Sequence, residues 1–141
     1  MIDTPLSVRN TSAGEFEIRR MAAEYTRAIA AGDRKKFLGF FADDIVMMPP
    51  GHPPARRREG VAALTDPLFE QFTMREEFEY DELQVVGDWA AGRFSYEFSV
   101  TPKAGGPVTT EIGKGMAWVR RNLAGSWQFT HLIWNLDRAA E

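Results

Sequence analysis

The second half of the chain alternates between apolar and polar residues, which is the pattern of strands that bury one face. Four such stretches are predicted as strands, at residues 78–86, 89–101, 108–121 and 127–137. Gly87-Asp88 is a tight-turn signal between the first two strands, and residues 104–107 mark the next turn. Strands joined by short turns pair antiparallel, so this half predicts a four-stranded meander.

The first half of the chain is helical in pattern. Apolar residues recur at helical spacing over residues 15–31, and Gly32 then ends this helix. Two further helices are predicted at residues 34–41 and 59–72, with a short apolar strand at 45–48 between them. Helices segregated from an antiparallel sheet indicate an α+β fold. We expect a curved antiparallel sheet wrapped around the long first of three helices, forming a cone with an open mouth.

Composition limits the classes of protein that this chain can belong to. Its 141 residues suit a single domain, predicted over residues 14–141 after a loose arm at 1–13. Cysteine is absent, which removes disulfides and thiolate metal sites. A net charge of −3 argues against a general nucleic-acid binder. No apolar run is long enough for a membrane span and no signal peptide is visible, so a cytoplasmic protein is expected.

The last predicted strand gives the main functional signal. It reads WQFTHLIWNLD and places His131, Trp134, Asn135 and Asp137 among apolar residues. Buried polar groups need partners, so such a strand either satisfies them locally or lines a cavity. Alternation alone does not decide which face is concave, and a bulge near His131 would switch the faces midway. A histidine inside the cone and a hydrogen-bonded histidine on the outer face are equally compatible with this pattern.

Several short motifs stand in a fixed order over roughly residues 15–137. They include Gly32-Asp33, Phe41-Ala42-Asp43-Asp44, Met48-Pro49-Pro50-Gly51, Arg58-Glu59-Gly60-Val61, Gly87-Asp88-Trp89-Ala90, Trp118-Val119-Arg120-Arg121, Gly125-Ser126-Trp127 and Ile133-Trp134-Asn135. In order and spacing they resemble the nuclear-transport-factor-2-like, or SnoaL-like, superfamily, and within it the ketosteroid-isomerase homologues. One departure is Arg57, which stands where this branch usually has glycine. The resemblance implies a cone-shaped α+β barrel and a homodimer formed through the outer sheet face.

The resemblance does not fix the function, because the superfamily contains isomerases, dehydratases, polyketide cyclases and non-catalytic binders. Its isomerases use a tyrosine and a carboxylic acid as an oxyanion hole, with an aspartate as proton shuttle. That set does not map onto this sequence residue by residue. Its dehydratases use a buried histidine with an aspartate, and His131 with an aspartate would supply such a pair.

His131 is the candidate general acid or base, because histidine exchanges protons near neutral pH. Asn135 and Tyr25 are the candidates for orienting or polarising a carbonyl group. Tyr25 also suits a core aromatic residue, and two histidines without a placed carboxylate are too few to predict a metal site. The candidate ligand-binding residues are Met48, His52, Phe94, Trp118, Trp134 and Asp137.

Three functional hypotheses follow. The first is a cofactor-independent isomerase, dehydratase or cyclase acting on a small apolar molecule that contains a carbonyl group or resembles a polyketide. The second is a non-catalytic binder with the same pocket, and the third is a dimeric association module. The sequence has no nucleophile elbow, phosphate-binding loop or dinucleotide fingerprint, so covalent and nucleotide-dependent chemistry are disfavoured. No cofactor and no nucleic-acid or membrane partner is expected.

Overall fold

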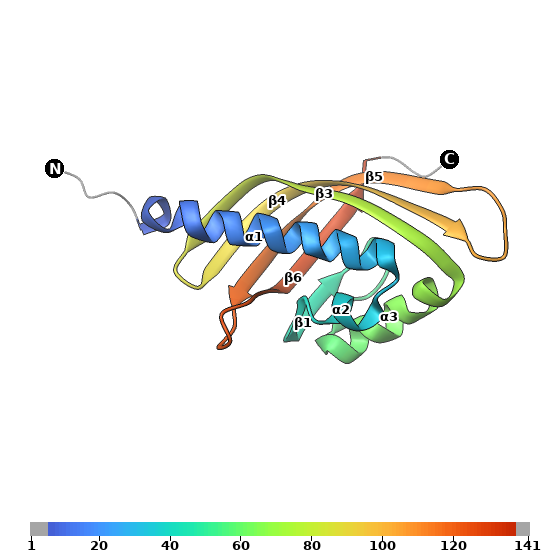
Figure 1. Ribbon diagram of the computed structural model, residues 1–141, viewed down its shortest axis with the longest axis horizontal. Helices are drawn as coiled ribbons and strands as arrows, with labels where there is room; N and C mark the ends of the chain where they lie inside the picture. The colour runs from blue at the N-terminus through green and yellow to red at the C-terminus, as the bar shows by residue number, and fades with distance from the viewer. Residues whose placement is uncertain (1–5, 138–141) are drawn as a thin grey trace.

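The computed structural model describes the backbone of residues 6–137 and the side chains of residues 13–137. Within that part of the chain, three helices precede or interrupt a six-stranded sheet (Figure 1). The elements are α1 (Leu6–Ala31), α2 (Arg34–Leu38), β1 (Phe41–Met48), β2 (Ala55–Arg56), α3 (Arg57–Gln71), β3 (Phe72–Val86), β4 (Trp89–Pro102), β5 (Thr109–Arg121) and β6 (Trp127–Leu136).

The sheet has the strand order β2-β1-β6-β5-β4-β3 and is curved without closing on itself. The meander from β3 to β6 is antiparallel, as predicted, whereas β1 lies parallel to β6. Bulges interrupt the pairing of β3 with β4 and of β5 with β6, and bulges bend the strands that contain them. The predicted α+β cone, with a long N-terminal helix and three helices in all, is confirmed.

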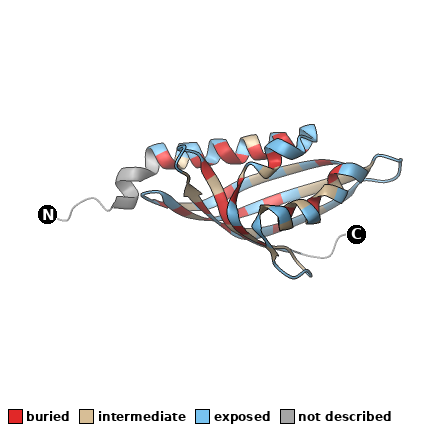
Figure 2. Ribbon diagram, turned by 90° about the horizontal axis from the view of Figure 1, so that it is seen from below, coloured by how far each residue is buried: buried red, intermediate tan, exposed pale blue. Residues whose placement is uncertain are grey.

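Helix α1 packs chiefly against β3 and presents its apolar stripe to the concave face of the sheet. Figure 2 shows the buried residues of α1 on the side that faces the strands. Tyr25 lies at the centre of this contact, where its ring is within 6.1 Å of Phe41, Phe78 and Phe129. This aromatic cluster buries a large apolar surface between α1 and the sheet.

Four elements begin earlier than the sequence pattern predicts. Strand β1 begins at Phe41 instead of residue 45, so the helix predicted at 34–41 ends at Leu38, and α3 begins at Arg57 instead of residue 59. Helix α1 begins at Leu6 instead of residue 15, so the backbone of residues 6–13 of the predicted arm is helical, and residues 1–5 lie outside the described part. Strand β3 begins at Phe72 instead of residue 78, because its first half pairs with the end of β4. The extra residues of β3 are rich in charge, and only the pairing partner makes them a strand.

Arg57 opens α3 with a φ of 65°. It is the described non-glycine residue with a positive φ, in the left-handed region that side chains with a Cβ disfavour. This position is the one where the resembling branch usually has glycine. The positive φ at this position therefore gives a backbone reason for the usual glycine.

Among the described residues, no helix is both long and apolar enough to cross a membrane.

Candidate functional site

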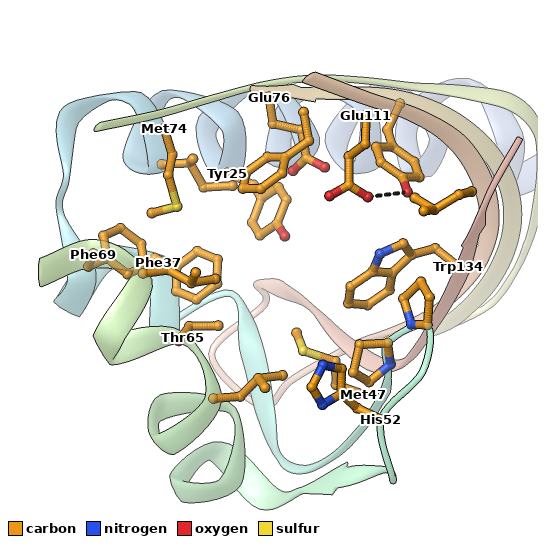
Figure 3. Close-up of a pocket in the computed structure, with 18 residues that line it drawn as sticks. Tyr25, Phe37, Met47, His52, Thr65, Phe69, Met74, Glu76, Glu111 and Trp134 are labelled. Carbon is orange, nitrogen blue, oxygen red and sulfur yellow. Dashed lines mark hydrogen bonds between the residues drawn. The ribbon is translucent and has the colours of Figure 1, made fainter. Parts of the chain in front are cut away.

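A cavity of about 350 Å³ lies between the concave face of the sheet, the three helices and the loop after β1 (Figure 3). Its size is in the range that suits a small organic ligand. Its walls are formed by Tyr25, Ile29, Phe37, Met47, Pro49, Pro50, His52, Leu64, Thr65, Leu68, Phe69, Met74, Glu76, Tyr96, Phe98, Glu111, Trp134 and Leu136. Most of these side chains are apolar or aromatic, so the site favours a ligand with an apolar body.

Two carboxyl groups project into this apolar cavity from the sheet. Glu76 on β3 and Glu111 on β5 are both cross-strand partners of Phe98 on β4. Cross-strand partners point to the same face of a sheet, so the three side chains form one row on the concave face. Figure 3 shows both carboxyl groups turned toward the same space.

Tyr96 holds the carboxyl group of Glu111. The hydroxyl of Tyr96 donates a hydrogen bond to Oε2 of Glu111 at 3.2 Å. Burial and the charge of Glu111 raise the pKa of Tyr96 well above its usual value, so this hydroxyl stays protonated and remains a donor. The ring of Tyr96 lies against Gly113, where a Cβ would overlap both the ring and the hydroxyl. A glycine at this position thus makes room for the tyrosine that orients Glu111.

Burial, and after it the charge of Glu111, raise the pKa of Glu76 from 4.5 to about 8. Glu76 is therefore protonated at neutral pH, beside a second carboxyl group that carries charge. Burial also raises the pKa of Tyr25, with the charge of Glu76 as the next cause. The cavity consequently holds proton donors in Glu76 and Tyr25 and a proton acceptor in Glu111.

The predicted bulge in the last strand is present, and it directs His131 outward. Trp118 pairs with His131 and Val119 pairs with Phe129, which leaves Thr130 as the extra residue. Phe129 is buried on the concave side before the bulge, and Trp134 lines the cavity after it. His131 falls between these inward positions, on the outer face.

The outer position satisfies the histidine locally. The hydroxyl of Thr130 donates to the carbonyl oxygen of Trp118 at 3.3 Å and lies 3.0 Å from Nδ1 of His131. The imidazole ring packs edge-on against Trp118, with 4.8 Å between ring centroids. His131 is not among the residues that line the cavity, so the structure does not bring it to the ligand site.

The other predicted site residues divide between the cavity and its surroundings. Tyr25, His52 and Trp134 line the cavity. Asn135 is the cross-strand partner of Lys114 on the outer face, where Lys114 also pairs with Asp137 at 2.7 Å.

Three further predicted ligand contacts also lie outside the cavity walls. Strand alternation turns Met47 into the cavity and Met48 away from it. Trp118 is half exposed on the outer face, and Phe94 is buried in the core, stacked on Phe78.

Glu76 and Glu111 are the cavity residues with carboxyl side chains that the sequence analysis missed. Residues 74, 76, 78 and 80 alternate with exposed residues on β3, and Glu76 is the charged member of this inward row. An acidic residue in phase with Met, Phe and Tyr was the available signal. It was hidden because the predicted strand began at residue 78. Within the described part of the chain, no three His, Asp or Glu side chains converge as ligands for a metal ion.

The chain belongs to the SnoaL-like domain family, whose model matches residues 13–128. Similar solved structures support the same assignment. A conserved protein from Planctomyces limnophilus is 25% identical, with 88% of this chain and 98% of that chain covered and a TM-score of 0.80. A ketosteroid isomerase-like protein from Erwinia carotovora atroseptica is 27% identical, with coverage of 91% and 99% and a TM-score of 0.78.

An NTF2-like protein with a cystatin-like fold from Novosphingobium aromaticivorans is 22% identical, with 94% of this chain and 86% of that chain covered and a TM-score of 0.74. This third likeness shows the fold alone. No curated protein matches the chain significantly.

Proposed function

We propose that the cavity binds a small, largely apolar molecule with a carbonyl group and moves protons on it without a cofactor. The observation that carries this proposal is the pair of carboxyl groups, Glu76 and Glu111, in an otherwise apolar cavity. A neutral carboxyl beside a charged one supplies an acid and a base to the same ligand. The 27% identical ketosteroid isomerase-like structure is a further support for this class of chemistry.

The proposed proton transfer assigns one role to each carboxyl group. Glu111, held by Tyr96, takes a proton from the carbon next to the carbonyl group. Glu76 donates a hydrogen bond to the carbonyl oxygen and thereby stabilises the enolate that forms. In a ketone with a neighbouring C=C bond, return of this proton from Glu111 to the far carbon of the conjugated enolate completes an isomerisation. In a ketone with a hydroxyl group on the next carbon, Glu111 gives the proton to that hydroxyl group, which leaves as water and completes a dehydration. In both cases no electrons are exchanged with a cofactor.

The experiment is proton exchange on a simple apolar ketone, 2-tetralone, incubated with the protein in D₂O and followed by NMR. We expect deuterium to enter the carbon next to the carbonyl group faster than in buffer. Glu111→Gln abolishes this increase, because the base is lost. Glu77→Gln is the matched control, since Glu77 is the neighbouring exposed residue on β3. An unchanged rate in the Glu111→Gln protein contradicts the proposed role.

A non-catalytic binder is the second candidate function. The same cavity supports it, since an apolar site with a few polar groups is sufficient for binding alone. This alternative is favoured if NMR shows that the ketone binds to the protein while deuterium enters it no faster than in buffer alone.

The outer face of the sheet supports a homodimer. Met116 and Trp118 on β5 and Ile133 on β6 are 51%, 48% and 47% exposed. Met116 pairs with Ile133, and Trp118 pairs with His131 beside them, so these side chains form one outer patch. Contiguous exposed apolar surface marks an association site, and we propose a second copy of this chain as the occupant. This role is compatible with a working cavity on the opposite face.

A further inference from the structure

The cavity carries negative charge that its own walls do not balance. Glu76 and Glu111 are its acidic residues. Among the described residues that line it, none is a lysine or an arginine. The lining residue with a basic side chain is His52, in the exposed loop after β1. With one proton held by Glu76, the carboxyl pair retains one negative charge inside an apolar cavity. Charge in such a place is stabilised by an opposite charge within a few Å.

The carboxyl group of Glu76 is free to form a hydrogen bond with a ligand. Its side chain is partly buried, and its carboxyl group is turned into the cavity (Figure 3). Within the described part of the chain, Tyr96 bonds to Glu111, and the Glu76 carboxyl group forms no hydrogen bond with another side chain or the backbone. A carboxyl group in an apolar cavity is stabilised by a partner, and the N–H group of a protonated amine in the ligand would supply one.

The remaining walls suit a cation as well. The aromatic rings of Tyr25, Phe37, Phe69 and Trp134 surround the space into which both carboxyl groups project (Figure 3). The face of an aromatic ring attracts a positive charge, and tryptophan does so most strongly. An ammonium group in this space gains carboxylate contacts on one side and ring contacts on the other, whereas an anion gains neither.

We propose that the natural ligand of this cavity carries a positively charged nitrogen, as a protonated amine or a quaternary ammonium group, on an apolar body. The nitrogen lies beside Glu111 and Glu76, and the apolar body lies against the aromatic walls. The inference names the substrate class of the proposed site and rests on that site being the functional one. It requires only binding, so it stands or falls separately from proton transfer.

The test uses two probes of nearly equal shape, 3-hydroxyphenyltrimethylammonium and 3-tert-butylphenol, titrated into the protein by calorimetry at pH 7. The ammonium compound is expected to bind at least tenfold more tightly than the neutral phenol. Glu111→Gln brings the two affinities to within about threefold, and continued binding of the phenol shows that the variant is folded. Glu77→Gln, the exposed neighbour, preserves the tenfold preference.

The pH dependence of the same titration gives a second readout. Groups that face Glu76 are Glu111 from β5, Tyr96 from β4, Tyr25 from α1, Tyr80 from its own strand and His52 from the loop after β1. For this readout phenyltrimethylammonium, which has no group that titrates between pH 6.5 and 9, replaces the hydroxylated ammonium probe. Glu76 loses its proton over this range, so affinity for phenyltrimethylammonium rises several-fold while affinity for 3-tert-butylphenol does not. In the Glu76→Gln protein this rise is absent.

Three results would overturn the inference. They are equal or tighter binding of the phenol by the unmodified protein, an ammonium preference that survives Glu111→Gln, and no binding of either probe. If the protein speeds deuterium exchange on the ketone but does not prefer the ammonium probe, this inference is wrong and the proposed function is retained. If the protein prefers the ammonium probe but does not speed deuterium exchange, the inference is retained and the proposed proton transfer is wrong.

Discussion

Glu76 and Glu111 are both cross-strand partners of Phe98, one on each side of it, so their carboxyl groups share the concave face of the sheet. The sheet thereby places two acids in a cavity whose other walls are mainly apolar. The two differ in their surroundings, since Tyr96 holds Glu111 while Glu76 faces the cavity (Figure 3). This difference in surroundings is the basis of the proposed roles of Glu76 as acid and Glu111 as base.

The stability of the protein is expected to fall as the pH rises from 4.5 to 8. The pKa of Glu76 is raised from 4.5 to about 8 on folding, so the folded state holds a proton in this range that the unfolded state has lost. The stabilising contribution is complete below pH 4.5 and is gone above pH 8, with a size on the order of 4 kcal/mol. Urea unfolding at pH 5, 6, 7 and 8.5 measures it.

The Glu76→Gln protein isolates this contribution from other titrating groups. It is expected to match the unmodified protein near pH 5 and to exceed it in unfolding free energy at pH 8.5, because no charge is then buried. Glu77→Gln, on the exposed face, should follow the unmodified protein throughout. A pH profile of Glu76→Gln that parallels the unmodified protein would show that Glu76 titrates normally.

Gly113→Ala is expected to lower the unfolding free energy by about 1–3 kcal/mol, as overpacking does. The added methyl group would meet the ring and hydroxyl of Tyr96 and the backbone oxygen of Asn135. Gly60→Ala is the matched control, because the nearest atom to its added Cβ is a backbone carbon 3.5 Å away and the site is helical. That variant should gain about 0.5–1 kcal/mol. Equal effects of the two changes would contradict the close packing at Gly113.

Arg57→Gly is expected to stabilise the protein by about 0.5–1 kcal/mol. Relief of the positive φ gains about 1–2 kcal/mol, and the greater freedom of glycine in the unfolded chain removes part of it. Arg56→Gly, at the neighbouring position with an ordinary φ of −107°, should lose stability instead. Thermal unfolding of both variants checks the sign, and a loss in Arg57→Gly would mean that the arginine makes a compensating contact.

Trp118→Glu is expected to shift the protein from dimer to monomer in sedimentation velocity, because a charge would be placed in the centre of the outer patch. Leu123→Glu supplies the control, since Leu123 is fully exposed in the turn between β5 and β6 and lies outside that patch. A dimer that persists in Trp118→Glu would place the interface elsewhere.

His131→Ala is expected to leave deuterium exchange on 2-tetralone within about twofold of the unmodified protein. The imidazole lies on the outer face with Trp118 and Thr130, and it does not line the cavity. NMR exchange rates measured beside those of Glu111→Gln make the comparison. If the exchange rate falls as far in His131→Ala as in Glu111→Gln, His131 takes part in the proton transfer and this prediction is wrong.

Much of the fold was predictable from local pattern. The apolar stripe of α1 and the alternation along β4 each identify the buried face, since the side-chain period depends only on the local backbone. The Gly87-Asp88 turn needs no more than its own residues, and Gly87 has the positive φ of 61° that such a turn requires.

The candidate site was harder to predict, because it depends on pairing between distant residues. Strand β3 extends back to Phe72 only because the end of β4 is there to pair with it, and Glu76 lies in that extension. His131 was undecided by alternation, and the extra residue Thr130 turned it outward.

The sequence by itself determined the element types, the buried stripes and the family, because these follow from side-chain period and turn chemistry. Tertiary structure alone decided which polar side chains meet. The carboxyl groups of Glu76 and Glu111 are 35 positions apart in the chain, and strand register brings them to one cavity. Burial of Glu76 there, with the charge of Glu111 nearby, raises the pKa of Glu76 and keeps its proton, and this depends on neighbours that are distant in the chain.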